Sequence, residues 1–369
     1  MKRVGLMDQV SLVLTLMLAL VGIVFVHSST HSVPGQSLMW VKQTLYLATG
    51  MVIYTVLALS DYKRWVDRGN WLGILGILLL VAVLVWGHKV NGARSWFRFP
   101  MFSLQPSEFV KISTILWVTK YFSSIQERPS SLIEFSVSCL MIGVPVGLIV
   151  MQPDLGTALL YLPFFLIPNF LLGNKESIWV TCIGILFVGL IIGGVIFKPN
   201  WVFFLKPYQK DRIIAFIYPE RDTSNSGYQV HQSKISIGQG GLFGMGIGKG
   251  KQTKLGFLPA QHNDFILAVV AEESGFLGMS ALMVMFLVLF WRGLATAVEA
   301  RDSMGSMLAA LAIGTLALQT LFNGAMLTGL VPTTGIPCPL VSAGGSSMWT
   351  TCALLGLVQS VRAHRFVNH

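Results

Sequence analysis

The chain has 369 residues, of which 53% are hydrophobic and only 11% charged, and its net charge is +10. Soluble domains carry about twice that fraction of charged residues, so the composition excludes an ordinary soluble protein. Apolar runs of about 17–25 residues, long enough to cross a bilayer, recur along the chain. We therefore predict an all-α polytopic membrane protein with a single domain over residues 1–369.

Ten apolar runs are predicted to span the membrane, which puts both ends of the chain on the same side. Lys and Arg are concentrated in the turns that share a side with the N-terminus, and this bias predicts cytoplasmic termini. No small-residue cleavage site follows the first run, so we expect no removable signal peptide. The predicted spans are 9–26, 39–59, 71–86, 105–122, 133–150, 157–172, 177–197, 274–291, 305–328 and 340–361.

Two polar stretches lie at the predicted outer ends of spans. "QPSEFVK" (105–111) opens the fourth span and puts Glu108 and Lys111 on one helical face. "MQPDLGT" closes the fifth span with Asp154. Ionisable groups at membrane depth are rare, and a functional role is the first hypothesis. The structural alternatives are that Glu108 complements the helix dipole and pairs with Lys111, and that Asp154 caps the next helix.

A long basic loop, residues 198–262, is predicted between the seventh and eighth spans on the outer face. It has nine basic residues, Arg212 among them, and three acidic ones, a net charge of +6. A basic loop that faces outward suggests an anionic partner at the outer membrane surface. A lipid-linked phosphate or pyrophosphate fits, and so do ordinary anionic headgroups. Nucleic acid is not expected on that side.

Within this loop, residues 236–252 contain seven glycines interleaved with Lys249 and Lys251. Glycine allows the backbone to approach a ligand closely, and successive N–H groups can hold phosphate oxygens. No strand-to-helix context supports a nucleotide-binding fold. The alternative is a tightly turned or flexible loop without a ligand.

The next polar stretch, "HND", precedes an apolar run and contains His262 and Asp264. Asn263 or Asp264 is a candidate N-cap for the helix that follows. An ionised carboxylate beside His262 is also what a general base or a divalent-metal ligand requires. Glu272 and Glu273 follow about two turns later. Either one of them faces a polar cavity, or residues 264–273 lie outside the bilayer and the span begins at Ser274.

The last outer loop, residues 329–347, has three prolines and several glycines that forbid a regular helix. Broken backbone at a membrane interface is tolerated where it lines a cavity or packs on protein, so this loop favours an outer-facing cavity. The cysteines show no metal spacing and no disulfide framework, and we expect small core residues. They are Cys139, Cys182, Cys338 and Cys352.

Taken in order, seven stretches of the chain resemble the SEDS family (shape, elongation, division and sporulation). The short N-terminus and "GYQVHQSK…GFLPAQH" look more like the elongation member than its division relative. The matching stretches are "NGARSWF" (91–97), "QPSEFVK" (105–111), "MQPDLGT" (151–157), "YQKDRIIAFIYPERD" (208–222), "GYQVHQSKISIGQGGLFGMGIGKGKQ" (227–252), "FLPAQHNDFILAVVAEESGFLG" (257–278) and "GLVPTTGIPCPLVSAGGSS" (329–347).

The resemblance implies a ten-span fold in the bacterial cytoplasmic membrane and a glycosyltransferase that polymerises lipid II into peptidoglycan strands on the outer face. It implies that Asp264 is the essential aspartate, and that Glu108, Lys111 and Asp154 belong to a central cavity. It further implies support by a divalent cation, Mg or Mn, and partnership with a class B penicillin-binding protein and other elongation-complex proteins.

Our hypothesis is inverting transfer, in which Asp264 deprotonates the acceptor hydroxyl or holds the activating metal. Lys111, Arg212 and the Lys/Gly loop with Lys249 would neutralise the departing pyrophosphate, and His262 would line the site. The rival hypotheses are a flippase or transporter of lipid-linked precursors, whose discontinuous helices would look similar, and a non-catalytic scaffold of the wall-synthesis complex.

Overall fold

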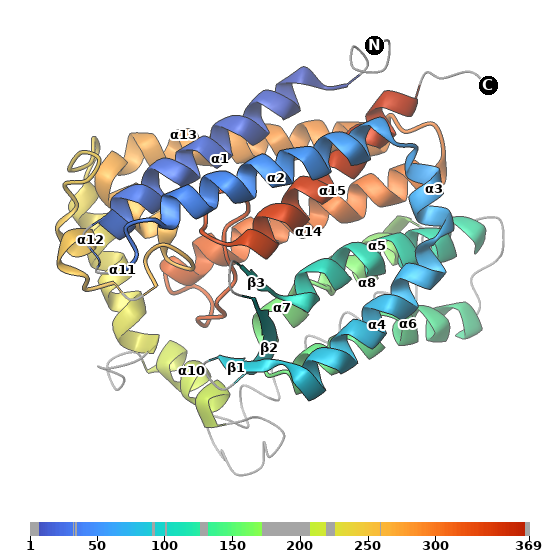
Figure 1. The fold of residues 1–369 in the computed structure, drawn as a ribbon, viewed down its shortest axis with the longest axis horizontal. Coiled ribbons are helices and arrows are strands. Elements are labelled where there is room, and N and C mark those ends of the chain that lie inside the picture. Colours follow the sequence, from blue (N-terminus) through green and yellow to red (C-terminus); the bar gives the residue numbers. More distant parts are fainter. Residues whose placement is uncertain are drawn as a thin grey trace.

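The computed structural model describes residues 7–31, 33, 35–90, 93–99, 102–125, 132–171, 207–218, 226–258 and 260–365. This part of the chain is a bundle of long helices with one small sheet (Figure 1). The helices are α1 (Gln9–His31), α2 (Met39–Leu59), α3 (Tyr62–Asp67), α4 (Gly69–Trp86), α5 (Pro106–Ile125), α6 (Leu132–Met151), α7 (Leu155–Leu159), α8 (Leu162–Leu171), α10 (Pro207–Ile217), α11 (Ser226–Gly240), α12 (Lys251–Leu255), α13 (Ile266–Val298), α14 (Ser303–Leu327) and α15 (Gly345–His364).

The long helices confirm that this is an integral membrane protein. Among the described residues, α1, α4, α13 and α14 are long and apolar enough to cross a bilayer by length and composition. The exposed Trp71 and Trp86 lie near the two ends of α4, as expected for side chains at the two membrane surfaces. Helices α2, α5, α6 and α15 have 20 or 21 residues each. The span predicted at 177–197 lies outside the described residues.

The two ends of the described chain lie together at one end of the bundle, at the upper right of Figure 1. The Asp8 N–H donates to Gln359 Oε1 at 2.9 Å, and the Asp8 carboxylate pairs with Arg292 Nε at 2.7 Å. We call this the terminal end. Helices α10, α11 and α12 and the sheet lie at the opposite end, which we call the loop end.

Basic residues predicted to be cytoplasmic gather at the terminal end. Lys63 pairs with Asp302 at 2.7 Å, and Arg362 and Arg365 both pair with Glu299. These pairs tie α3 and the end of α15 to the turn between α13 and α14. The clustering agrees with the charge bias that was used to orient the chain.

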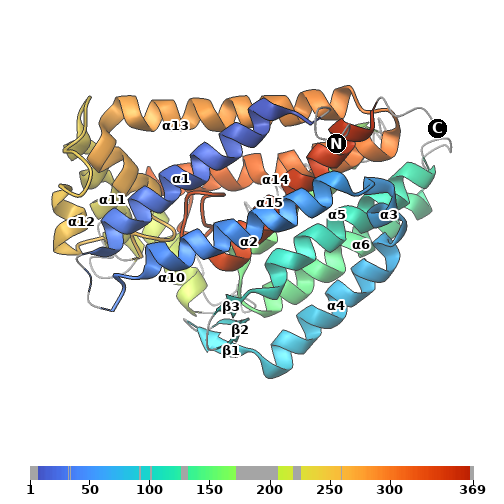
Figure 2. The same cartoon turned by 45° about the horizontal axis from the view of Figure 1, so that its top comes forward.

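Glycines allow the close helix contacts in the bundle. Three glycines on one face of α4, Gly69, Gly73 and Gly76, lie directly against α5, where an added Cβ would come within 2.6 Å of Leu116 O, Trp117 or Ser113. Small residues at such spacing let helix backbones approach in membranes, where no hydrophobic effect drives helices together. Figure 2, which turns the molecule by 45°, shows α4 and α13 on opposite sides of the bundle.

Helices α14 and α15 form the centre of the bundle. Nearly all of α15 is buried, including polar residues such as Thr350, Gln359 and Ser360. A helix this polar is stable at membrane depth because neighbouring helices, and not lipid, surround it. The central position of α15 could not be deduced from its hydropathy.

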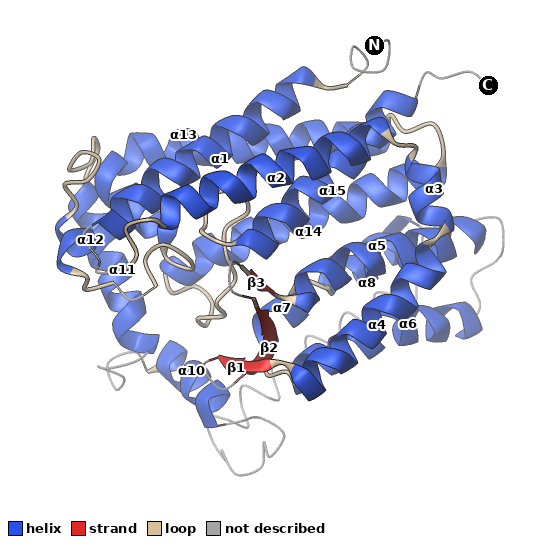
Figure 3. Ribbon diagram, viewed as in Figure 1, coloured by secondary structure: helices blue, strands red, loops and turns tan. Residues whose placement is uncertain are grey.

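The sheet was not predicted from the sequence. Strands β1 (His88–Val90), β2 (Ala93–Arg98) and β3 (Ser103–Leu104) pair antiparallel in the order β1-β2-β3 between α4 and α5 (Figure 3). The sheet leads the chain into Gln105, whose N–H donates to Ser346 Oγ at 3.0 Å. It thereby fixes the start of α5 against the start of α15.

Helix α13 is kinked at Gly275, which has φ 66° and ψ −166°. The first part, residues 266–273, is buried, whereas Phe276 and Leu277 are exposed. The break agrees with the alternative in which the membrane-exposed span begins near Ser274. It also means that Glu272 and Glu273 do not lie in the straight, membrane-exposed part of the helix.

Candidate active site

The "HND" segment is held by its backbone. Three successive carbonyls accept hydrogen bonds from different elements: His262 O from Ala343 N at 2.9 Å, Asn263 O from Ser342 Oγ at 2.7 Å, and Asp264 O from Asn323 Nδ2 at 2.9 Å. The donors come from the loop after α14 and from α14 itself. Catalytic groups need this kind of support, because a side chain can be aimed only if its backbone is fixed.

The side chains of the segment remain available. Asp264 is partly exposed, and within the described part of the chain its carboxylate accepts no hydrogen bond. Phe265, not Asp264, is the N-cap residue of α13, and no side chain caps this helix. The capping alternative for Asp264 was therefore wrong. The carboxylate is fixed in place but not used by the fold.

The electrostatic surroundings tune this carboxylate. Loss of water contact raises the pKa of Asp264 to about 6, while Arg212 opposes the rise and the Asp154 carboxylate adds to it. Burial lowers the pKa of His262, so its ring is neutral at physiological pH. A carboxyl group with a pKa near 6 is mostly ionised at pH 7 and still basic enough to accept a proton.

Asp154 closes one side of the site. Its carboxylate caps α7 by accepting from Thr157 N at 3.1 Å, and it also accepts from Gln105 Nε2 and Thr157 Oγ1 at 2.8 Å each. The capping role proposed as the alternative for Asp154 is confirmed. Because its oxygens are occupied, Asp154 acts on Asp264 through its charge.

Glu108 and Lys111 form a buried ion pair. Lys111 Nζ lies 2.9 Å from Glu108 Oε1, and the exposed fractions of the two side chains are 1% and 4%. Lys111 Nζ also approaches Gln319 Oε1 at 3.4 Å, and Gln319 Nε2 donates to Pro337 O at 2.8 Å. The pairing alternative is confirmed, and neither side chain faces open space. Contact of Lys111 with substrate stays a prediction.

Arg212 reaches the site from α10. Its Nη1 donates to Thr333 O at 3.0 Å, and its side chain is partly exposed. Thr333 belongs to the same broken loop that holds "HND". Arg212 is thus a basic residue of the 198–262 loop that the structure brings near Asp264.

Lys249 lies elsewhere, on the glycine-rich loop between α11 and α12. Backbone N–H groups of this loop and of the first turn of α12 serve the protein's own carboxylates. Glu272 accepts from Gln252 N at 2.8 Å and Thr253 N at 3.2 Å, both in α12, and Gly248 and Gly250 of the loop donate to Glu273. The loop is therefore a carboxylate cradle in this structure. The expectation that the loop cradles phosphate stays a prediction, and the structure shows backbone N–H groups of this region bound to Glu272 and Glu273.

Two amide side chains on α14 were missed by the sequence reading. Asn323 is fully buried and its Nδ2 also donates to Ile336 O at 2.7 Å, while Gln319 links Lys111 to the loop after α14. Amides four residues apart in an apolar span were a usable signal, since polar groups at that depth need partners.

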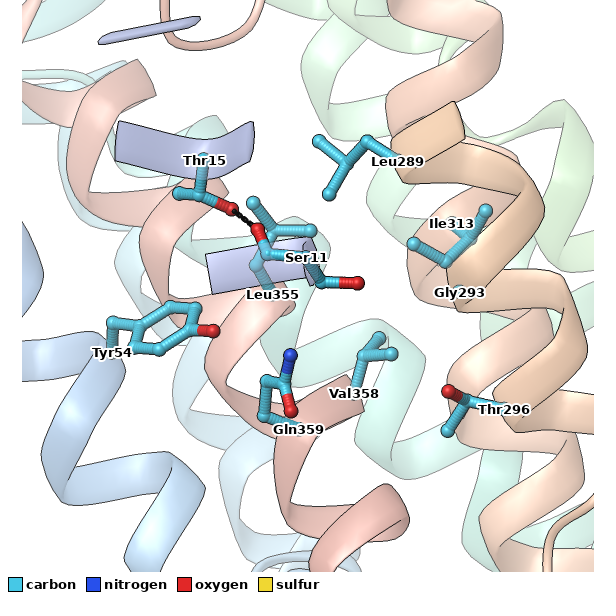
Figure 4. Close-up of a pocket in the computed structure, with 10 residues that line it drawn as sticks. All are labelled: Ser11, Thr15, Tyr54, Leu289, Gly293, Thr296, Ile313, Leu355, Val358 and Gln359. Carbon is cyan, nitrogen blue, oxygen red and sulfur yellow. Dashed lines mark hydrogen bonds between the residues drawn. The ribbon is translucent and has the colours of Figure 1, made fainter. Parts of the chain in front are cut away.

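A small internal cavity lies near the terminal end, more than about 30 Å along α13 from Asp264. It has room for about one water molecule and is lined by polar groups that include Ser11, Tyr54 and Gln359 (Figure 4). It plays no part in the Asp264 site. Among the described residues, no group of three or more His, Cys, Asp or Glu could hold a metal ion.

Comparisons with known proteins cover almost the entire chain. The FtsW/RodA/SpoVE family model, described as "Cell cycle protein", matches residues 8–366. Stage V sporulation protein E of Bacillus subtilis is 33% identical over 365 residues, 96% of each chain. "Peptidoglycan glycosyltransferase RodA" of Treponema pallidum is 32% identical over 98% of this chain and 99% of its own.

A solved structure described as showing "structural coordination of polymerization and crosslinking by a peptidoglycan synthase complex" contains a similar chain. The TM-score is 0.79 at 28% identity, and the match covers 98% of this chain and 99% of that one. The fold and the SEDS resemblance seen in the sequence are thereby confirmed.

Proposed function

Since this chain belongs to the FtsW/RodA/SpoVE family, we propose that it is a peptidoglycan glycosyltransferase that polymerises lipid II into glycan strands. The names of the curated relatives support the activity. On this chain's own residues, the proposal rests on the "HND" segment. Its three backbone carbonyls are fixed by hydrogen bonds, while the Asp264 carboxylate accepts no hydrogen bond within the described part of the chain.

The reaction is inverting glycosyl transfer. The 4-hydroxyl oxygen of the acceptor sugar forms a bond to the anomeric carbon of the donor, and the bond from that carbon to the pyrophosphate oxygen breaks. The hydroxyl proton passes to Asp264, and polyprenyl pyrophosphate leaves with the electron pair. Because pyrophosphate is a good leaving group, the reaction needs one base and no covalent nucleophile. A pKa near 6 suits the Asp264 carboxylate to the role of this base.

Among the described residues, Arg212 is well placed to stabilise the departing pyrophosphate, because the residue is partly exposed and its charge is close enough to lower the pKa of Asp264. Lys111 is enclosed with Glu108, so it contributes through the field of the pair or after a rearrangement that opens it. Preorganised positive charge at a developing anion is a large catalytic effect. Lys249 is not part of this group.

We propose further that a divalent cation, Mg or Mn, supports the reaction, and that holding this cation is the alternative to the role of Asp264 as the base. Mg²⁺ is commonly bound by one or two carboxylates together with substrate phosphates and water, so a three-residue cage is not required. The carboxylate of Asp264, free of hydrogen bonds within the described part of the chain, fits that role, whereas the oxygens of Asp154 are occupied. When bound, the cation neutralises phosphate charge.

The same reasoning extends to the setting. We place the enzyme in the bacterial cytoplasmic membrane with both termini in the cytoplasm and Asp264 on the outer face, and we propose an elongation role. A class B penicillin-binding protein that crosslinks the product, together with other elongation-complex proteins, is the proposed partner set. The similar chain from a complex for polymerization and crosslinking supports the transpeptidase partner.

The proposal is tested with the full-length protein and its transpeptidase partner in liposomes. With crosslinking blocked and lipid II and Mg²⁺ supplied, we expect glycan polymer, and we expect chelation of the cation to stop its formation. Polymer that is absent while fluorescent lipid-linked precursor crosses the bilayer would instead identify a flippase. Absence of both would favour the scaffold.

A further inference from the structure

The glycine-rich loop and α12 expose large apolar side chains. Leu242, Phe243 and Ile247 have exposed fractions of 62%, 80% and 60%, and Leu255 and Phe257 are exposed as well. We call these five residues the loop-tip patch. Exposed apolar side chains gathered in one segment mark a surface that contacts another protein, a ligand or the membrane, and the position of the patch indicates the membrane.

The patch is attached to the outermost turn of the exposed part of α13. Phe276 N donates to Gly241 O at 2.8 Å, and Leu277 N donates to Leu242 O at 3.1 Å. A Cβ on Gly275 would lie 2.3 Å from Gly244 N, so the kink of α13 and the loop fit closely. Leu242, the first residue of the loop-tip patch, therefore has the same height along the bundle as Phe276.

That height is the edge of the apolar face of α13. The exposed large side chains of this face begin at Phe276 and end at Val298, and 22 residues at about 1.5 Å per residue span about 33 Å. A bilayer core is about 30 Å thick, so this face accounts for one full crossing. The loop-tip patch thus lies at the hydrocarbon boundary, continuous with a face that lipid covers. The face includes Phe276, Leu277, Val284, Leu287, Trp291, Leu294 and Val298.

Lysines flank the patch on the polar side. Lys249, Lys251 and Lys254 are exposed, and in the described part of the chain none of them pairs with a carboxylate. Apolar side chains beside several lysines are typical of segments that lie in the headgroup region, with the charges at the phosphates. The net charge of the segment matches a leaflet rich in anionic lipid.

The loop cannot fold its apolar side chains inward, because its backbone is fixed to the protein. Met245 N and Gly246 N donate to Glu272 O and Glu273 O at 3.0 and 2.9 Å, and Ser28 Oγ holds the Glu273 carboxylate at 2.6 Å. The buried carboxylates thus present the patch outward on a rigid base.

We propose that residues 241–257 are a membrane anchor, seated in the lipid leaflet at the loop end, with the loop-tip patch at the acyl boundary and the three lysines on anionic phospholipid headgroups. The anchor holds the chain leading to Asp264 at headgroup depth. Lys249, first considered as a substrate ligand, is assigned to this lipid contact.

The test uses full-length protein without partners, reconstituted in liposomes of phosphatidylcholine and phosphatidylglycerol. An environment-sensitive fluorophore is attached at Phe243→Cys, on a background with the four native cysteines replaced by alanine. His231→Cys, exposed on α11 about 14 Å before the C-terminal end of that helix, is the matched control. Quenching by nitroxide lipids labelled near the headgroup is expected to be roughly threefold stronger at position 243.

A second arm measures the charge contribution. Lys251→Glu with Lys254→Glu is expected to weaken the dependence of quenching at position 243 on the fraction of phosphatidylglycerol, while glycan polymerisation by the enzyme continues. Equal quenching at positions 243 and 231 would overturn the proposal. Shielding of position 243 from a water-soluble quencher only after another protein is added would also overturn it, and would make the patch a protein-docking surface.

Discussion

Lys111→Met tests the buried ion pair that lies beside the site. The substitution keeps most of the side-chain volume and removes the positive charge 2.9 Å from Glu108. With 4% of its side chain exposed, Glu108 would be left as an uncompensated buried carboxylate. Removing one partner of such a pair costs about 3–5 kcal/mol of stability, much of it because the remaining charge cannot be solvated.

The matched variant Glu108→Gln with Lys111→Met removes both charges. We expect most of the loss to be recovered, because replacing a buried pair by neutral groups of similar volume is often close to neutral. The free energy of unfolding in detergent micelles, measured for wild type, both single variants and the double variant, gives a coupling energy of about 2–4 kcal/mol on this reasoning. Additive effects of the two single substitutions would refute the buried pair and indicate that both groups are solvated in an open cavity.

Three further outcomes follow from the same geometry. The polymerisation rate is expected to rise with pH through a midpoint near 6, since the base is the ionised form of Asp264, and a rate that is flat from pH 5 to 7.5 would contradict the assignment. The folded-state pKa of Asp264 exceeds the ordinary value of 3.8, so its contribution to the free energy of unfolding should increase as the pH falls from about 6 to 4. Gly275 has φ 66° and no room for a Cβ, so Gly275→Ala should cost about 2–4 kcal/mol of stability and lower the melting temperature. Gly324→Ala is the control, because an added Cβ there would have no atom within 4 Å and the melting temperature should not change. Equal melting temperatures of the two variants would count against the kink. Asn323→Leu leaves the carbonyls of Asp264 and Ile336 unpaired and should cost about 2–5 kcal/mol in a chemical-denaturation series, and an unchanged midpoint would show that these two hydrogen bonds contribute little.

Apolar periodicity was sufficient to locate most helices. The span predicted at 39–59 coincides with α2, and the spans predicted at 71–86, 105–122 and 133–150 lie within a few residues of α4, α5 and α6. These helices are long and continuous, so local composition decides them. The predicted span at 157–172 is instead divided into α7 and α8, where the Asp154 cap starts a short separate helix.

The departures arise from contacts between distant parts of the chain. The kink at Gly275 exists because the backbone at Leu242 and Gly244 lies against it, and no local pattern indicates that partner. The glycine-rich loop resembles a phosphate cradle in sequence, yet N–H groups of the loop and of α12 bind Glu272 and Glu273 from a helix about 20 residues later. Composition alone cannot tell which anion a loop of glycines will hold.

The site itself was predicted in part. Asp264 was singled out because a charge before an apolar run is costly, and the structure adds that its carboxylate is left free while its backbone is clamped. Asn323 and Gln319 were not singled out, since their role depends on carbonyls of Asp264, Ile336 and Pro337 that fold beside them.

Asp264→Asn provides the most direct test of the proposed mechanism. The substitution preserves the shape of the side chain, and the backbone bond from Asn323 does not depend on the carboxylate. The rate of glycan-strand formation from lipid II, measured per folded enzyme at pH 7.5, is expected to fall by about 10²–10⁴-fold with little change in the unfolding midpoint. A correctly folded variant that polymerises within a few-fold of the wild-type rate would contradict the assignment of Asp264 as the catalytic base or metal ligand.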